Sequence, residues 1–188
     1  RMVLRVESAW GEELYASEVK VTESISPQTA FIIDRLLQEV VRDGTGWRAR
    51  ALGRPVAGKT GTTNDEQDAW YIGFAPYLLT GVYVGFDQLT PMGKWETGSR
   101  AASPIWVNYR KAVEEDYPVQ DFRQPPGVVM ARIDPDSGLL AGPGSEQSYF
   151  LPFKSGTQPV RTAQDAGPGK TRPGSSGSGG EDLMKQVF

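Results

Sequence analysis

Two reactive side chains are missing from this sequence, which contains no cysteine and no histidine. Without thiols, the chain can form neither a disulfide nor a cysteine nucleophile. Without imidazoles, it can build neither a Ser-His-Asp triad nor a metal site that depends on histidine ligands. Any acid–base chemistry therefore falls to lysine, tyrosine or carboxylate side chains.

The sequence also has little net charge and no long apolar run. It carries 20 basic and 23 acidic residues, mixed along the chain, for a net charge of -3. We therefore expect no nucleic-acid partner and no polybasic contact with a membrane. No run of about 18 apolar residues occurs, so no segment is expected to span a bilayer. The abrupt start at Arg1, without a signal peptide, suggests a piece of something longer.

Hydrophobic periodicity predicts a mixed α and β chain. Strands are expected at residues 1–7, 14–21, 55–62, 68–76, 78–87 and 128–133, helices at 27–42 and 102–116, and loops at 44–53 and 89–101. Ser26 and Ser103 are the expected N-terminal caps, and Gly44 is expected to end the first helix in a left-handed conformation. Consecutive strands without intervening helices favour antiparallel pairing over βαβ units.

Two motifs overlap within one short stretch. Residues 53–60 fit G-x-x-x-x-G-K-[ST], the pattern of a phosphate-binding P-loop, and residues 59–61 read K-T-G. A P-loop needs a buried strand before it and a helix directly after it. Residues 47–52 are too polar for such a strand, and residues 61–67 carry no apolar helical stripe. A nucleotide-binding domain is therefore the weaker alternative.

On a strand, the same residues suit a carboxylate ligand. Lys59 offers a charge-assisted hydrogen bond, and Thr60 and Thr62 point to one side of the strand. Gly61 lets a substrate backbone approach, and the Thr62 N–H can face a developing oxyanion. The plain alternative is a non-catalytic scaffold in which this strand is only structural.

The longer string from Arg54 to Phe74, R-P-V-A-G-K-T-G-T-T-N-D-E-Q-D-A-W-Y-I-G-F, closely resembles the transpeptidase domain of class A, 1A-type penicillin-binding proteins. These are bifunctional peptidoglycan synthases. The resemblance spans roughly residues 3–159 and includes the segments 26–30, 44–46, 80–87, 101–106 and 156–159. It implies an α+β fold in which helices flank an antiparallel sheet.

The resemblance and the change in composition after Pro125 together predict a division of the chain. Residues 1–124 would be the C-terminal part of the transpeptidase domain, and residues 125–162 a short β-rich extension. Residues 163–188, rich in Gly, Ser and Pro, would form a disordered linker and tail.

In function, the resemblance implies D,D-transpeptidation. A serine attacks the D-Ala-D-Ala bond of one stem peptide, and an amine of a neighbouring stem resolves the acyl-enzyme. Lys59, Thr60, Gly61 and Thr62 would bind substrate, with the two threonines holding its terminal carboxylate. Peptidoglycan stem peptides and β-lactam antibiotics would be the ligands, with no cofactor and no metal. The parent protein would lie at the outer, periplasmic face of the cytoplasmic membrane, anchored by a missing N-terminal segment.

This sequence departs from the family pattern at the nucleophile. The family uses Ser-x-x-Lys and Ser-x-Asn, yet neither Asn64 nor Asn108 has a serine two residues earlier. The single Ser-x-x-Lys begins at Ser17, which we expect in a strand and too close to the Ser26 helix. We therefore expect no catalytic residue in this chain, an inactive fragment, and upstream glycosyltransferase and transpeptidase segments. A serine β-lactamase piece is disfavoured by the long extension beyond Pro125.

Several other side chains have structural interpretations. At least one of Trp70 and Tyr71 is expected in the core, as is Trp106. Asp68 is expected in a turn or an ion pair. The acidic run at residues 114–116 is expected to form a solvated helix end.

Overall fold

The computed structural model describes residues 2–18 and 22–166. Its central element is a three-stranded antiparallel sheet with the order β3-β4-β5. The strands are β3 (Ala57–Thr62), β4 (Asp68–Ala75) and β5 (Leu78–Gly85). β4 and β5 are joined by a tight turn and pair from Asp68 with Gly85 to Ala75 with Leu78. The expected antiparallel hairpin is therefore confirmed.

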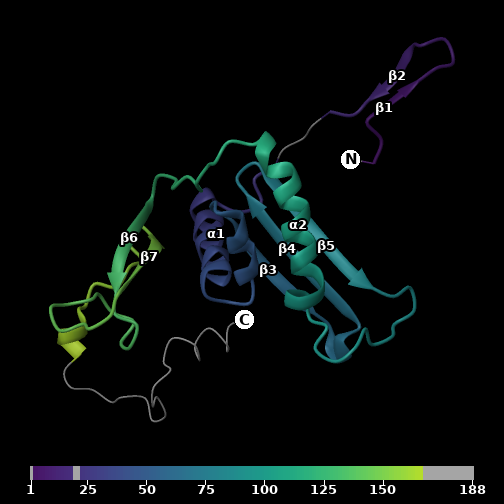
Figure 1. The fold of residues 1–188 in the computed structure, drawn as a ribbon. Helices are drawn as coiled ribbons and strands as arrows, with labels where there is room; N and C mark the ends of the chain where they lie inside the picture. The colour runs from purple at the N-terminus through teal and green to yellow at the C-terminus, as the bar shows by residue number, and fades with distance from the viewer. Residues whose placement is uncertain (1, 19–21, 167–188) are drawn as a thin grey trace.

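Two helices pack against one face of this sheet. α1 spans Pro27–Arg42, as the sequence predicts, and α2 spans Ser103–Val113 and crosses the sheet in Figure 1. The helices and the sheet share one core, formed by Val41, Ala49, Val56, Ala69, Tyr71, Ala75, Ala102, Trp106 and Val107. Antiparallel strands flanked by helices confirm the expected α+β class, and the buried Tyr71 and Trp106 confirm their expected place in the core.

The start of α1 follows the prediction, but its end does not. The Ser26 side chain accepts a hydrogen bond from the Thr29 N–H at 3.3 Å, as an N-terminal cap should. At the other end, Gly44 is absent from the residues with positive φ, and Asp43 is the cap, with φ -132°. Gly44 is needed for space instead, because a Cβ there would lie 2.9 Å from the Val40 carbonyl oxygen.

Both predicted loops contain helical turns. A 3-10 helix, Trp47–Leu52, occupies the first loop and ends at Gly53, which has φ +65°. A π-helical turn, Gly98–Ala102, occupies the end of the second. Ser103 does not cap α2, because its hydroxyl donates to the Ser99 carbonyl oxygen of that turn at 2.8 Å. These turns were not predicted because segments of five or six residues are too short to show an apolar helical stripe.

Two smaller sheets are formed by the segments before and after the central sheet in the sequence. β1 (Arg5–Glu7) and β2 (Glu13–Ala16) form the predicted N-terminal hairpin, which stands apart from the central sheet in Figure 1. β6 (Val128–Ile133) matches its prediction and pairs with β7 (Tyr149–Lys154). β7 was missed because its residues do not alternate and Pro152 interrupts it, which disfavours a strand.

The remaining helical turns are short. They are 3-10 helices at Asn64–Glu66, Glu114–Asp116 and Ala163–Ala166. The predicted end of the second strand, at residues 19–21, lies outside the described residues. Of the linker and tail predicted at residues 163–188, only residues 163–166 are described, and they form the last of these turns. Within residues 2–18 and 22–166, no helix is long and apolar enough to cross a membrane.

A buried ion cluster ties α2 to the chain entering β3. Glu114 accepts hydrogen bonds from Arg110 Nε and Arg54 Nη1, each at 2.6 Å, and from the Tyr77 hydroxyl. Arg110 is fully buried and Glu114 nearly so. The prediction of a solvated acidic run is therefore wrong at Glu114, although Glu115 is exposed. The α2 helix turns the Glu114 carboxylate inward, where two guanidinium groups neutralise it.

Candidate functional site

The K-T-G residues lie on β3, at one edge of the described central sheet. β3 pairs only with β4 there, with Thr60 opposite Tyr71 and Thr62 opposite Ala69. The next residue, Thr63, donates its N–H to the Asp68 carbonyl oxygen at 3.0 Å. Because backbone groups of an antiparallel strand alternate in direction, the N–H and C=O groups of Thr60 and Thr62 point away from β4. The backbone groups of both threonines therefore face the open edge of the sheet.

Lys59 brings a positive charge to the same edge. Its side chain leaves the strand on the face opposite to Thr60 and Thr62, since successive residues alternate. The ammonium then turns to the edge, where Nζ donates to the Thr60 carbonyl oxygen at 3.0 Å. Partial burial lowers the pKa of Lys59 below its usual value, because desolvation disfavours the charged form.

The two threonine hydroxyls have partners from different segments. Thr60 Oγ1 lies 2.8 Å from Thr45 Oγ1, on the turn that follows α1. Thr62 Oγ1 accepts a hydrogen bond from the Gly98 N–H at 3.0 Å, from the π-helical turn before α2. Both helices thus contribute an adjoining turn that contacts a β3 hydroxyl.

Gly98 lies directly against the backbone of the sheet. A Cβ at this position would collide with the carbonyl oxygens of Gly61 and Trp70. Only glycine therefore allows the turn to bring its N–H to Thr62. Gly61 is less tightly restricted, since a Cβ there would lie 3.2 Å from the Trp70 Cβ.

Sequence reasoning did not assign a role to Thr45, to Gly98 or to the Glu114 cluster. A signal for Thr45 was present in the string Gly44-Thr45-Gly46, which belongs to the family resemblance. The sequence held no such signal for Gly98, because the residues that crowd its backbone, Gly61 and Trp70, are distant from it in the sequence.

The overlapping P-loop pattern does not form a P-loop. Its residues Gly58, Lys59 and Thr60 lie inside β3, where a phosphate-binding loop would instead lead into a helix. The next helical segment is the three-residue turn Asn64–Glu66, which contains a non-helical residue. Among the described residues, no α-helix directly follows Lys59 and Thr60, so the nucleotide-binding alternative lacks its geometry.

Ser17 lies in the N-terminal hairpin, directly after β2. Its N–H donates to the Leu4 carbonyl oxygen at 2.8 Å, so it continues the pairing of the two strands. It does not open a helix, which is the position expected of a Ser-x-x-Lys nucleophile.

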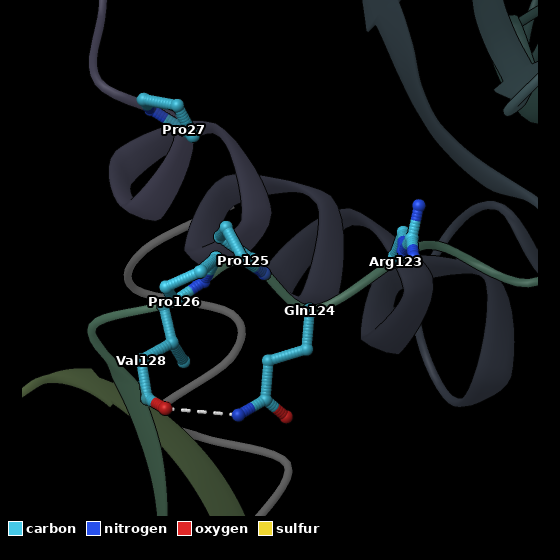
Figure 2. A pocket seen from close by; sticks show the side chains of 6 residues that line it. All are labelled: Pro27, Arg123, Gln124, Pro125, Pro126 and Val128. Atoms are coloured by element: carbon cyan, nitrogen blue, oxygen red, sulfur yellow. Dashed lines mark hydrogen bonds between the residues drawn. The ribbon is translucent and has the colours of Figure 1, made fainter.

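A hollow on the surface lies away from the K-T-G strand. It is located between the start of α1 and the segment that leads into β6 (Figure 2). The residues that line it are Pro27, Arg123, Gln124, Pro125, Pro126 and Val128. Gln124 Nε2 donates to the Val128 carbonyl oxygen at 2.9 Å, which closes one side. None of Lys59, Thr60 and Thr62 lines this hollow, so we do not assign it to the candidate site.

Comparisons with known proteins agree with the fold and the motifs. The model of the family described as "Penicillin binding protein transpeptidase domain" matches residues 3–105. The model described as "Penicillin-binding protein 1A, C-terminal domain" matches residues 124–166. The first match covers more than half of the chain.

Curated relatives and a solved structure give the same result. Penicillin-binding protein 1A of Aquifex aeolicus is 46% identical over 139 residues, which cover 74% of this chain and 19% of that protein. The Pseudomonas aeruginosa protein of the same name is 45% identical over 136 residues, covering 72% and 16%. The crystal structure of penicillin-binding protein 1A from Haemophilus influenzae matches with a TM-score of 0.70 at 30% identity, over 85% of this chain and 29% of that one.

The chain therefore spans less than a third of the length of these relatives. Its family is nevertheless shown by the transpeptidase match over residues 3–105, and the similar structure agrees with it. This chain belongs to the penicillin-binding protein transpeptidase family, and its relatives include penicillin-binding proteins 1A.

Proposed function

We propose that this chain supplies the substrate-binding strand of a D,D-transpeptidase that cross-links peptidoglycan stem peptides. Family membership supports the class of reaction. The arrangement of Lys59, Thr60 and Thr62 along the open edge of β3 supports the assignment of the strand. The observation that carries the proposal is this edge, where a cation, two hydroxyls and the outward-pointing N–H of Thr62 lie together.

Each group at the edge has a chemical task in the proposal. The Lys59 ammonium and the Thr60 and Thr62 hydroxyls recognise the terminal carboxylate of the peptide, because charge-assisted hydrogen bonds to carboxylates are strong. The outward-pointing Thr62 N–H donates to the oxygen of the scissile carbonyl as negative charge develops there. Gly61 keeps the space beside the strand free for an extended peptide.

The chemical steps need a serine from elsewhere in the full-length protein. Its Oγ forms a bond to the carbonyl carbon of the D-Ala-D-Ala link, and the C–N bond breaks to release D-alanine. An amine of a second stem peptide then displaces the serine and forms the cross-link. β-Lactams acylate the same serine when their carboxylate occupies the β3 edge. This activity assigns the full-length protein to the outer face of the cytoplasmic membrane, where peptidoglycan is assembled.

The test is the rate of penicillin acylation in the full-length protein with Thr60 replaced by valine. We expect the second-order rate constant to fall about ten- to one-hundred-fold, because a hydrogen bond to a charged group contributes roughly 1.5–3 kcal/mol. The matched control is Thr90→Val, at an exposed position in the loop after β5, which should leave the rate unchanged. Equal rates for Thr60→Val and the unsubstituted protein would overturn the assignment of this strand.

A further inference from the structure

Thr45 is a polar residue beside the β3 edge to which the proposed reaction gives no task. It lies 15 residues before Thr60, and their hydroxyl oxygens are 2.8 Å apart. Thr45 is exposed and Thr60 is half-buried, so a ligand can reach this pair of hydroxyls. The contact therefore adds a second hydroxyl next to the one that we assign to the substrate carboxylate.

The turn that presents Thr45 is tightly built. The N–H groups of Gly44 and Gly46 both donate to the Val40 carbonyl oxygen at 3.0 Å, which closes the end of α1. A Cβ at Gly44 would lie 2.9 Å from that same oxygen, and a Cβ at Gly46 would lie 3.2 Å from it. Glycine is therefore required on both sides of Thr45, and the turn holds the threonine in one place.

A core side chain fixes the distance between the turn and the strand. Tyr71 is fully buried and lies opposite Thr60 in the sheet. A Cβ at Gly46 would lie 3.2 Å from the Tyr71 hydroxyl oxygen, and a Cβ at Gly58 only 2.6 Å from it. The same phenol thus packs against the Thr45 turn and against β3. Because cores are close-packed, this contact makes the Thr45–Thr60 pair part of a rigid unit.

The chemistry of the ligand sets the direction of the hydrogen bond between the two hydroxyls. An ionised carboxylate can only accept hydrogen bonds, so Thr60 must donate its proton to it. The Thr60 oxygen can then accept a hydrogen bond from the Thr45 hydroxyl. We propose that Thr45 is a positioning residue, whose hydroxyl donates to Thr60 and so aims the Thr60 proton at the carboxylate of the ligand. This inference rests on the proposed function of Thr60.

The test is a double-mutant cycle in the full-length protein, read out as the rate of acylation by benzylpenicillin. Thr45→Val keeps the branched shape and removes the hydroxyl. We expect acylation to slow about five-fold, because losing the net contribution of one hydrogen bond between neutral groups changes a rate by about this factor. Thr45→Ser restores the hydroxyl and should recover the rate to within about two-fold. In a Thr60→Val background, the Thr45→Val effect should vanish, because the residues act as one unit.

The cycle separates positioning from a purely structural role. A structural defect would lower the melting temperature and would slow acylation equally in both backgrounds, which would overturn the inference. Thr45→Ala provides a second variant without the hydroxyl, so the result does not depend on the folding of one protein. An unchanged rate in either folded variant would also overturn the inference. If the unsubstituted protein is not acylated at all, the proposed function itself fails.

Discussion

At the scale of single residues, the half-buried Lys59 sets the electrostatics of the candidate site. Its ammonium is partly desolvated and is held by the Thr60 carbonyl oxygen. A carboxylate ligand would meet a cation that has already lost part of its hydration shell, which strengthens their attraction. Burial has a cost for the free protein, because it favours the uncharged amine and lowers the pKa.

We predict that Lys59 titrates below 10.5, the ordinary lysine value. Between the lowered pKa and that value, the unfolded chain binds more protons, so the free energy of unfolding should rise with pH in this window. The measurement is an NMR titration of the ¹³C-methylated chain, with Lys59→Arg to identify the resonance. A midpoint at or above 10.5 would show that the ammonium is not desolvated.

At the scale of elements, local sequence patterns predicted the regular structure well. α1 has the predicted bounds because it combines a clear apolar periodicity with a capped start at Ser26. β6 has them because it is a short apolar run that ends at the turn of residues 134–138. The K-T-G residues were correctly expected on a strand. β7 was missed because Pro152 and poor alternation hide a strand whose pairing with β6 depends on long-range contacts.

The contacts that complete the candidate site could not be predicted in the same way. Thr45 meets Thr60, and Gly98 meets Thr62, only after the turns beside α1 and α2 have packed onto the sheet. Glu114 was misassigned for the same reason, since its two arginine partners come from α2 and from the segment before β3. Tertiary packing therefore determines these three groups, and local propensity does not.

The buried ion cluster gives a prediction at this scale. Glu114→Gln should lower the free energy of unfolding by about 3–5 kcal/mol, because it leaves the buried Arg110 charge without its carboxylate partner. The control is Glu115→Gln, the exposed neighbour, which should change stability by no more than about 0.5 kcal/mol. Urea denaturation of the chain measures both. Equal stabilities for the two variants would mean that the cluster does not anchor α2.

At the scale of the whole molecule, one face of the central sheet is covered and the other is open. The covered face holds Tyr71 and packs against both helices. The open face exposes apolar residues of β4 and β5, namely Trp70 (43%), Ile72 (44%), Leu79 (66%) and Tyr83 (48%). Contiguous apolar surface of this kind marks a contact region in soluble proteins. We therefore expect the remaining part of the transpeptidase domain to cover this face in the full-length protein.

Intact-mass spectrometry with and without benzylpenicillin tests the central claim most directly. Under the proposed function, the full-length protein should gain the mass of one penicillin, because we propose that this chain provides the carboxylate-binding strand and that a serine elsewhere in the protein is the nucleophile. The 188-residue chain alone should gain no mass. Acylation of the chain alone at any serine, or no adduct on the full-length protein, would contradict the account.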